Sequence, residues 1–220
     1  MAACLYRMTV WASFIRFTTQ KAMTKKFEVL EQEIIYSGFF RLEKYRLKHT
    51  LFGGGWSPEI SRELFVRGSC VAVLLYDPRV DKVVLIEQFR AGAIIKPDRA
   101  WLIEIVAGAV EEGETAEGVA YRESIEEAGC EIQDLIVINE FYTTPGGASE
   151  RITLFCGKVD SSQIGGIYGL DHEHEDILVT TVNFDEAYQM IENGTIESAI
   201  PIIAIQWLAL NKQKLRQQWL

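Results

Sequence analysis

The sequence of 220 residues has only four cysteines and no long uncharged run. The cysteines form no CxxC pair and match no zinc-binding spacing, so we expect them to pack as small apolar side chains in a reducing cytoplasm. No uncharged stretch approaches the ~20 residues that a membrane-spanning helix requires. Internal repeats and linker-like stretches are also absent. These absences argue against a disulfide scaffold, a membrane partner and a repeat array. The length of 220 residues corresponds to one large or two small globular domains.

Basic residues are scarce as well, with 22 Lys+Arg against 31 Asp+Glu and a formal net charge of −9. This excess of acid disfavours nucleic acid as a partner, because phosphate backbones attract Lys and Arg. The charge is unevenly distributed: residues 1–27 carry five basic groups and no acid, and the remaining 193 residues carry 17 basic and 31 acidic groups. The body of the protein is therefore strongly acidic, and the positions of these acids need an explanation.

Short β-branched and aromatic runs dominate the first half of the chain, as is typical of strands. Strands are predicted at 27–36, 39–48, 60–66, 70–76, 83–89, 101–106, 132–142, 151–159 and 177–182, and helices at 115–128, 185–193 and from 198 onward. Gly129 is expected to end the first helix. The pattern predicts an α+β fold with a tail at 1–22, a β-rich segment at 23–67 and a sheet-rich main domain at 68–220.

The predicted helix at 115–128 carries a cluster of acids. At about 100° per residue, Glu123 and Glu127 are neighbours on successive turns, and Glu126 lies beside them. Like charges at this spacing repel one another, and Arg122 alone does not neutralise all three. Oxygen ligands on a rigid helix suit a hard cation such as Mg²⁺ or Mn²⁺, which keeps coordination positions for substrate phosphates. A solvated acidic helix face is the alternative reading of the same spacing.

Seven identities at fixed spacing extend this pattern. They are Gly108, Glu114, Arg122, Glu123, Glu126, Glu127 and Gly129, and they fit the Nudix box G-x5-E-x7-R-E-U-x-E-E-x-G-U. U stands for an aliphatic residue, and the two U positions here hold the smaller Ser124 and Cys130. The chain thus resembles the Nudix hydrolases, which use divalent metals to hydrolyse a pyrophosphate that links a nucleoside to another group. The resemblance implies an α/β/α sandwich around a mixed sheet and more than one Mg²⁺ or Mn²⁺ ion per site. It implies Glu123, Glu127 and the carbonyl of Ala107 as metal ligands, with Glu126 less certain, and Arg122 as the residue that orients the glutamates.

Segments outside the box resemble the bacterial ADP-ribose pyrophosphatases from about Glu31 onward. They are 38–40, 62–68, 84–90, 101–104 and 200–208, together with Pro145, which stands 16 residues after Gly129. The resemblance implies a homodimer in which the β-rich segment 23–67 is exchanged and completes the partner's active site. The implied substrate-binding residues are Phe39, Phe40, Arg62, Glu63, Arg67, Arg90, Ala109, Thr144, Pro145, Gly146 and Glu150. The alternatives are that Phe39 and Phe40 are core residues and that Arg62 is a surface ion-pair partner.

A second acidic cluster, at 169–177, precedes the last predicted strand. In an extended chain Glu173 and Glu175 would point one way and His172 and His174 the other. A zinc site at the two histidines lacks a third ligand at suitable spacing, and a plain hydrophilic loop is the common alternative. The resemblance implies Glu173 as the catalytic base and Glu175 as a further metal ligand.

The resemblance implies Mg²⁺-dependent hydrolysis of ADP-ribose to AMP and ribose 5-phosphate, by water that Glu173 activates for attack on the adenosyl phosphate. The expected partner is a small nucleoside diphosphate sugar. Two alternatives stay open: a Nudix hydrolase of another nucleoside diphosphate sugar, and a non-catalytic ADP-ribose-binding module. The second is disfavoured because the acidic residues of the box and of the loop are all present.

Overall fold

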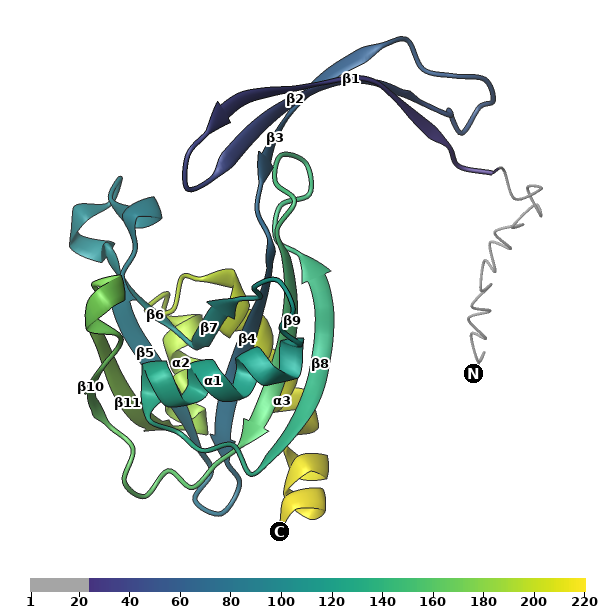
Figure 1. Ribbon diagram of the computed structural model, residues 1–220. Helices are drawn as coiled ribbons and strands as arrows, with labels where there is room; N and C mark the ends of the chain where they lie inside the picture. The colour runs from purple at the N-terminus through teal and green to yellow at the C-terminus, as the bar shows by residue number, and fades with distance from the viewer. Residues whose placement is uncertain (1–23) are drawn as a thin grey trace, which may run out of the picture. The chain divides into compact units, whose positions relative to one another are not determined.

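The computed structural model describes residues 24–220 and divides them into two compact units (Figure 1). One unit comprises 44–63 and the described residues up to Glu33, and the other comprises Ile34–Glu43 and Leu64–Leu220. The tail predicted at 1–22 lies outside the described residues. The domain boundaries predicted from the sequence stay predictions.

The N-terminal part contains a three-stranded sheet with the order β1-β2-β3. Its strands are β1 (Phe27–Ser37), β2 (Arg41–His49) and β3 (Ile60–Val66). All 11 residues of β1 are exposed in the single chain, including Phe27 at 72%, Ile34 at 56% and Tyr36 at 61%. Exposed large apolar side chains in such number are typical of an interaction surface.

The main sheet has eight strands in the order β10-β11-β5-β4-β9-β8, with β6 paired to β5 and β7 paired to β4. Its strands are β4 (Ser69–Asp77), β5 (Lys82–Phe89), β6 (Trp101–Glu104), β7 (Val106–Ala109), β8 (Asp134–Tyr142), β9 (Arg151–Lys158), β10 (Gly166–Tyr168) and β11 (Ile177–Asn183). The pair β4–β9 is parallel and its neighbours are antiparallel. The predicted mixed sheet is therefore confirmed.

Helices cover both faces of this sheet (Figure 1). The helix α1 (Ala116–Ala128) packs on one face, and α2 (Phe184–Glu192) and α3 (Ala199–Trp219) pack on the other. Alternation along the buried strand β4 explains this layering, because Val73 belongs to the core beneath α1 and Leu74 to the core beneath α2 and α3. The predicted α/β/α sandwich is confirmed.

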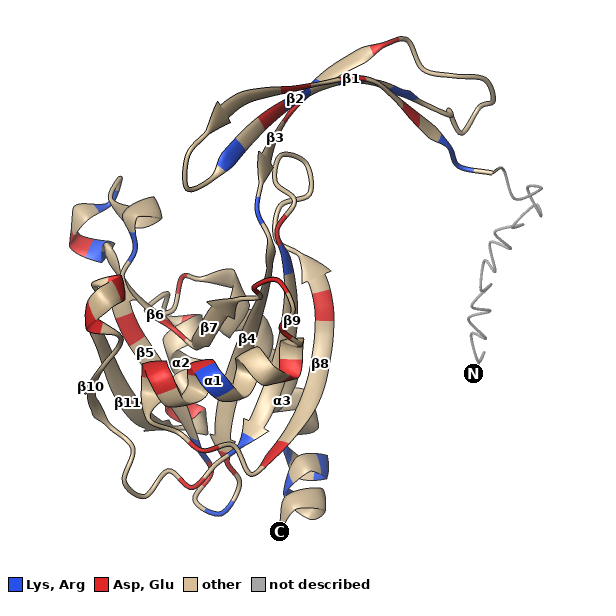
Figure 2. Ribbon diagram, viewed as in Figure 1, with Lys and Arg blue, Asp and Glu red and all other residues tan. Residues whose placement is uncertain are grey.

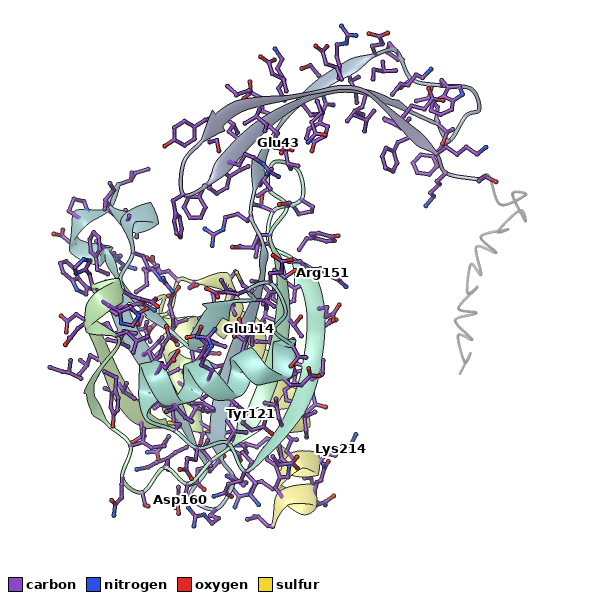
Figure 3. The ribbon with its side chains drawn as sticks, in the orientation of Figure 1. Glu43, Glu114, Tyr121, Arg151, Asp160 and Lys214 are labelled. Atoms are coloured by element: carbon purple, nitrogen blue, oxygen red, sulfur yellow. The ribbon has the colours of Figure 1, made fainter. Side chains whose placement is uncertain are left out.

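The ends of α1 follow from local chemistry. The Thr115 hydroxyl oxygen caps the first turn by accepting a hydrogen bond from the Gly118 N–H at 3.1 Å. Gly129 ends the helix in the left-handed conformation with φ 61°. Tyr121 (labelled in Figure 3) and Ile125 are 42% and 56% exposed, so these two apolar side chains of the helix lie on the surface.

Three features of the fold differ from the sequence prediction. The strand predicted at 101–106 divides at Ile105 into β6 and β7, and β10 was not predicted. The short 3₁₀ helices η1 (Ala91–Ala93), η2 (Pro97–Arg99) and η3 (Asp171–Glu173) were missed, since three residues are too few to produce a periodic pattern. In the part of the chain that the structure describes, no helix has both the length and the apolar character needed to cross a membrane.

Candidate active site

Two glutamates of α1 face the sheet. Acidic residues gather along this helix and on the segment before β11 (Figure 2). Glu127 is only 3% exposed, and its Oε2 accepts a hydrogen bond from the Ala107 N–H of β7 at 2.9 Å. Burial raises the pKa of Glu127 to about 8, and repulsion from Glu123 and Glu175 adds to the shift. Burial likewise raises the pKa of Glu123 to about 7, in spite of the neighbouring Arg122.

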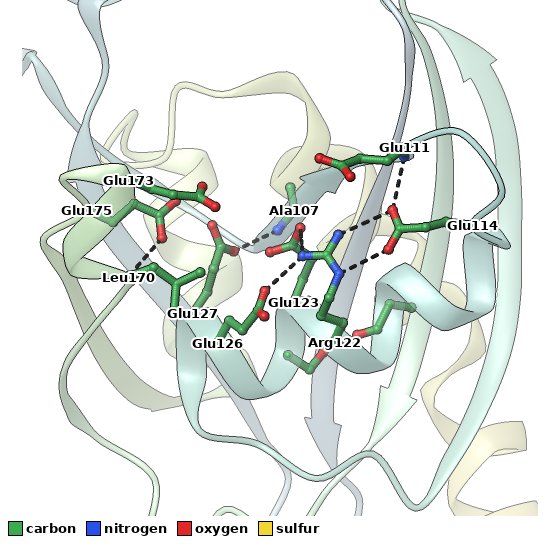
Figure 4. Close-up of polar contacts among 12 residues, drawn as sticks. Ala107, Glu111, Glu114, Arg122, Glu123, Glu126, Glu127, Leu170, Glu173 and Glu175 are labelled. Atoms are coloured by element: carbon green, nitrogen blue, oxygen red, sulfur yellow. Dashed lines mark hydrogen bonds and ion pairs between the residues drawn. The ribbon is translucent and has the colours of Figure 1, made fainter.

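Arg122 binds three carboxylates of the box (Figure 4). Its Nε lies 3.1 Å from Glu114 Oε1, and its Nη1 lies 2.9 Å from Glu123 Oε1 and 2.8 Å from Glu126 Oε2. Glu114 Oε2 also accepts a hydrogen bond from the Glu111 N–H at 2.9 Å. Because a guanidinium stays charged and presents its donors in a fixed fork, this set holds the glutamate side chains in a defined orientation.

The acidic loop brings Glu175 close to this helix. The side chains of Glu173 and Glu175 are drawn at the Glu127 end of α1 in Figure 4, and the charge of Glu175 raises the pKa of both Glu123 and Glu127. Glu175 Oε2 accepts a hydrogen bond from the Leu170 N–H at 3.2 Å. The side chain of Glu173 is 55% exposed.

The extended conformation considered for this loop is wrong. Residues Asp171–Glu173 form η3, and His174 follows in the left-handed region with φ 58°. A 3₁₀ turn places successive side chains about 120° apart, so the alternation of Glu173 and Glu175 against the histidines is lost. Gly169, with φ 110°, gives Glu175 its room, because a Cβ at position 169 would lie 2.6 Å from the Glu175 Cβ.

The donor set suits a hard divalent cation, although the side chains of residues 24–220 contain no ready cluster of three or more His, Cys, Asp or Glu ligands. Burial is the main cause of the raised pKa values of Glu123 and Glu127, and repulsion from neighbouring carboxylates adds to both shifts. The carboxyl group of Glu123 occupies the space that a Cβ at Gly108 would need. The carboxylate oxygens of this site match the ligand preference of Mg²⁺.

An aromatic and charged cluster forms beside the Pro145 turn. The Arg67 guanidinium stacks on the Phe40 ring, with 4.6 Å from its carbon to the ring centroid. Arg67 Nη2 also lies 3.0 Å from Glu150 Oε1. Phe40 contacts Phe65 edge to face at 5.0 Å, and Phe39 is 95% exposed. Phe39 is therefore not a core residue, and three of the predicted substrate-binding residues, Phe40, Arg67 and Glu150, lie together.

The turn that contains Thr144, Pro145 and Gly146 is attached to the same cluster. The Thr144 carbonyl accepts hydrogen bonds from the Gly147 and Ala148 N–H groups at 3.1 and 3.0 Å, and the Phe65 N–H donates to the Gly147 carbonyl at 2.8 Å. Ser149 completes the attachment: its Oγ accepts from the Arg67 N–H at 2.8 Å and donates to the Arg67 carbonyl at 2.7 Å. Ser149 was not among the predicted site residues, and only the structure shows this clamp of Ser149 on Arg67.

The remaining predicted residues lie elsewhere. Ala109 ends β7 opposite Cys70 of β4, and Arg90 follows β5 and pairs with Glu104. Arg62 and Glu63 belong to the other compact unit, where Arg62 Nη1 donates to the Ser61 carbonyl at 2.7 Å. The role of Glu104 was not predicted, since one glutamate at the end of a short strand gives no periodic signal.

The arrangement of α1, with its cluster of glutamates, on a mixed sheet is that of a Nudix domain. A family model described as NUDIX domain matches residues 66–200, and the chain belongs to this family.

Among its relatives are two ADP-ribose pyrophosphatases. The one from Haemophilus influenzae is 46% identical over 195 residues, covering 87% of this chain and 90% of the relative. The one from Escherichia coli (strain K12) is 46% identical over 192 residues, covering 87% and 92%. The GDP-mannose pyrophosphatase of Enterobacter sp. is 30% identical over 191 residues, covering 86% and 98%. A solved structure titled "Crystal structure of ADP compounds hydrolase" has a TM-score of 0.65 at 17% identity, covers 87% of this chain and 97% of that chain, and supports the fold.

Proposed function

We propose that the protein hydrolyses the pyrophosphate of ADP-ribose to AMP and ribose 5-phosphate in a Mg²⁺-dependent reaction. The observation that carries this proposal is the cluster of carboxylates at Glu123, Glu127 and Glu175, in which burial and mutual repulsion raise the pKa of Glu123 and of Glu127. The 46% identity to two ADP-ribose pyrophosphatases over most of the chain supports the choice of substrate.

In this proposal Glu123, Glu127, Glu175 and the Ala107 carbonyl hold more than one Mg²⁺ ion, with Mn²⁺ as the other candidate. The bound cations supply charge neutralisation for the pyrophosphate. Arg122 keeps Glu123 oriented and Ala107 keeps Glu127 oriented, through the contacts at 2.9 Å described above. Glu173 takes the proton of the attacking water, and its exposed position lets the loop close with substrate.

The cluster beside the Pro145 turn binds the nucleotide. Adenine stacks on the aromatic pair Phe39 and Phe40, since flat rings offer large contact areas. Arg67 and Glu150 contact the base and ribose, and Arg90 contacts a phosphate oxygen. The backbone of Thr144, Pro145, Gly146 and Ala109 lines the path of the ribose and the phosphates.

We further propose a homodimer with shared active sites, in which Arg62 and Glu63 of one subunit complete the site of its partner. The exposed apolar side chains of β1 support this assembly, because Phe27, Ile34 and Tyr36 are each more than half exposed in the single chain. A cytoplasmic location fits the three cysteines of the described region, which are all free.

A second candidate function is hydrolysis of another nucleoside diphosphate sugar. The observation that favours it is the 30% identity to a GDP-mannose pyrophosphatase over nearly the full length of that relative. A non-catalytic ADP-ribose-binding module is disfavoured, because Glu123, Glu127, Glu173 and Glu175 are all present and Glu127 accepts a hydrogen bond from the Ala107 N–H.

One assay separates these functions. The wild-type protein is incubated with ADP-ribose, GDP-mannose, ADP-glucose and UDP-glucose, each with Mg²⁺ or with EDTA, and the products are identified. The proposal expects AMP and ribose 5-phosphate from ADP-ribose with Mg²⁺ only, at the highest kcat/KM of the panel. In ¹⁸O-labelled water the label is expected in AMP, since the attack is on the adenosyl phosphate. Metal-dependent cleavage of GDP-mannose alone supports the second candidate, and no cleavage of any sugar refutes both.

A further inference from the structure

An ion pair links Arg90, which directly follows β5, to Glu104, the last residue of β6. Arg90 Nε donates to Glu104 Oε2 at 2.7 Å, and the Arg90 N–H donates to the Ala100 carbonyl at 2.8 Å. The Glu104 side chain is 14% exposed and that of Arg90 is 42% exposed. The acidic partner, Glu104, is thus mostly buried, and the basic partner, Arg90, is accessible to solvent.

Strand register places Glu104 on the side of the sheet that α1 covers. Glu104 lies opposite Ile86, and Ile86 belongs to the core beneath α1. In an antiparallel pair, directly opposed residues point to the same face. The positive charge of Arg90 lowers the pKa of Glu127, which puts the guanidinium within electrostatic range of the carboxylate cluster.

Glu104 accepts a hydrogen bond from the Arg90 guanidinium only at Nε. Within residues 24–220, the terminal nitrogens Nη1 and Nη2 of Arg90 have no hydrogen-bond partner. These two nitrogens form the edge of the guanidinium that binds a phosphate through two parallel hydrogen bonds. A long flexible side chain held at Nε loses much of its freedom before substrate arrives, and less ordering is then needed on binding.

We infer that Glu104 is a positioning residue for the proposed reaction. It holds Arg90 by Nε, so that Nη1 and Nη2 are offered together to one phosphate group of the substrate's pyrophosphate. This inference rests on the proposed function for the identity of the substrate. The alternative is that the ion pair has a structural role only and stabilises the packing of β6 against β5.

A double-mutant cycle distinguishes a positioning role from a fastening role. The variants are Glu104→Ala, Arg90→Ala and the double variant, with Glu104→Gln as the conservative replacement. Glu104→Ala is expected to raise KM for ADP-ribose by about tenfold with kcat changed less than about threefold, since it removes binding that precedes the chemical step. In the Arg90→Ala background the same change is expected to leave KM within about twofold, because no guanidinium remains to be positioned. Glu104→Gln keeps an acceptor oxygen for Nε and is expected to recover most of the loss.

Glu87→Ala is the matched control. Glu87 lies one residue beyond Ile86 on the same strand, opposite Ile103, and points to the other face of the sheet. Its KM is expected to equal that of the wild type. An equal effect of Glu104→Ala in both backgrounds, or no effect in either, overturns the inference.

A second readout keeps this test separate from the proposed function. Wild type that cleaves no nucleoside diphosphate sugar refutes that function, whatever the variants do. The pair is then tested by calorimetric titration of inorganic pyrophosphate with Mg²⁺. The inference is supported if Glu104→Ala weakens binding in the wild-type background but not in the Arg90→Ala background. It is overturned if all four proteins of the cycle bind equally well.

Discussion

The carboxyl group of Glu123 lies in the space that a side chain at position 108 would fill. Gly108 stands opposite Val71, whose side chain belongs to the core beneath α1, so the bare Cα of Gly108 faces that helix. Its φ is not positive, so the glycine is required for space and not for backbone conformation. The first glycine of the box and its glutamate 15 residues later therefore form one structural unit.

Replacing Gly108 by alanine should therefore damage the metal site and spare the fold. The new Cβ displaces the flexible end of Glu123, which moves away from Glu127. We expect Mg²⁺ affinity to fall by about tenfold or more, as for loss of a residue that orients a ligand. Isothermal titration with Mg²⁺ measures the affinity, and circular dichroism checks the fold. Gly92→Ala is the control, because a Cβ there meets nothing within 4 Å. Unchanged affinity in Gly108→Ala would show that Glu123 does not need its present position.

The buried Glu127 should make the metal-free protein less stable as pH rises. Its pKa in the folded state is about 8, against an ordinary value of 4.5, so the folded form holds a proton that the unfolded chain releases. The contribution of the Glu127 proton to the free energy of unfolding is fully present below pH 4.5 and is lost as pH rises through about 8. Between pH 5.5 and 8 we expect the free energy of unfolding in EDTA to fall by on the order of 1–3 kcal/mol. Urea denaturation at the two pH values measures this change.

Glu127→Gln is the informative variant for that experiment. The amide oxygen can still accept the hydrogen bond from the Ala107 N–H, but the side chain no longer titrates. We expect the larger part of the pH dependence to disappear, with the remainder due to Glu123. An identical pH dependence in the wild type and in Glu127→Gln would mean that Glu127 is ionised in the folded protein across this range.

The sequence predicted those parts of the fold that have strong local causes. Gly129 was expected to end α1, and it does so at φ 61°, the conformation that glycine adopts most easily. Ser124 departs from the aliphatic residue of the box, and the structure gives the reason. The side chain is fully buried, and its hydroxyl donates to the Ala120 carbonyl at 2.7 Å. The small residue therefore fits beneath α1 without an unsatisfied polar atom.

Contacts between distant segments could not be predicted in the same way. The stacking of Arg67 on Phe40 and the clamp of Ser149 on Arg67 join residues up to 82 positions apart. Spacing along a chain reports periodicity within one element and not the pairing of two loops. The η3 turn is a second case, since the left-handed His174 changes the direction of the chain between Glu173 and Glu175 without leaving any period-2 or period-3.6 signal.

Glu173 is expected to act on turnover and not on binding. In Glu173→Gln the side chain keeps its size but cannot take a proton from water. We expect kcat to fall by about 10²–10⁴-fold, with KM and Mg²⁺ affinity within about twofold of the wild type. Steady-state kinetics with ADP-ribose measures this. Asp171→Asn is the control, because it changes another acidic residue of the η3 turn and leaves the proposed base in place. It should keep near wild-type turnover. Near wild-type kcat in Glu173→Gln would remove this residue from the proposed base role.

The proposed sharing of active sites predicts complementation between two defective subunits. Arg62→Ala lacks the group that one subunit lends to its partner, and Glu173→Gln lacks the base of its own site, so each homodimer is expected to be nearly inactive. In a mixed dimer one site contains both intact residues and the other contains both changes. After equal mixing and subunit exchange, half of the dimers are mixed, and about a quarter of wild-type activity should appear. Light scattering checks that the variants remain dimeric, and unmixed samples taken through the same exchange serve as controls. If Arg62 instead serves the site of its own chain, no mixed dimer contains an intact site and mixing restores no activity.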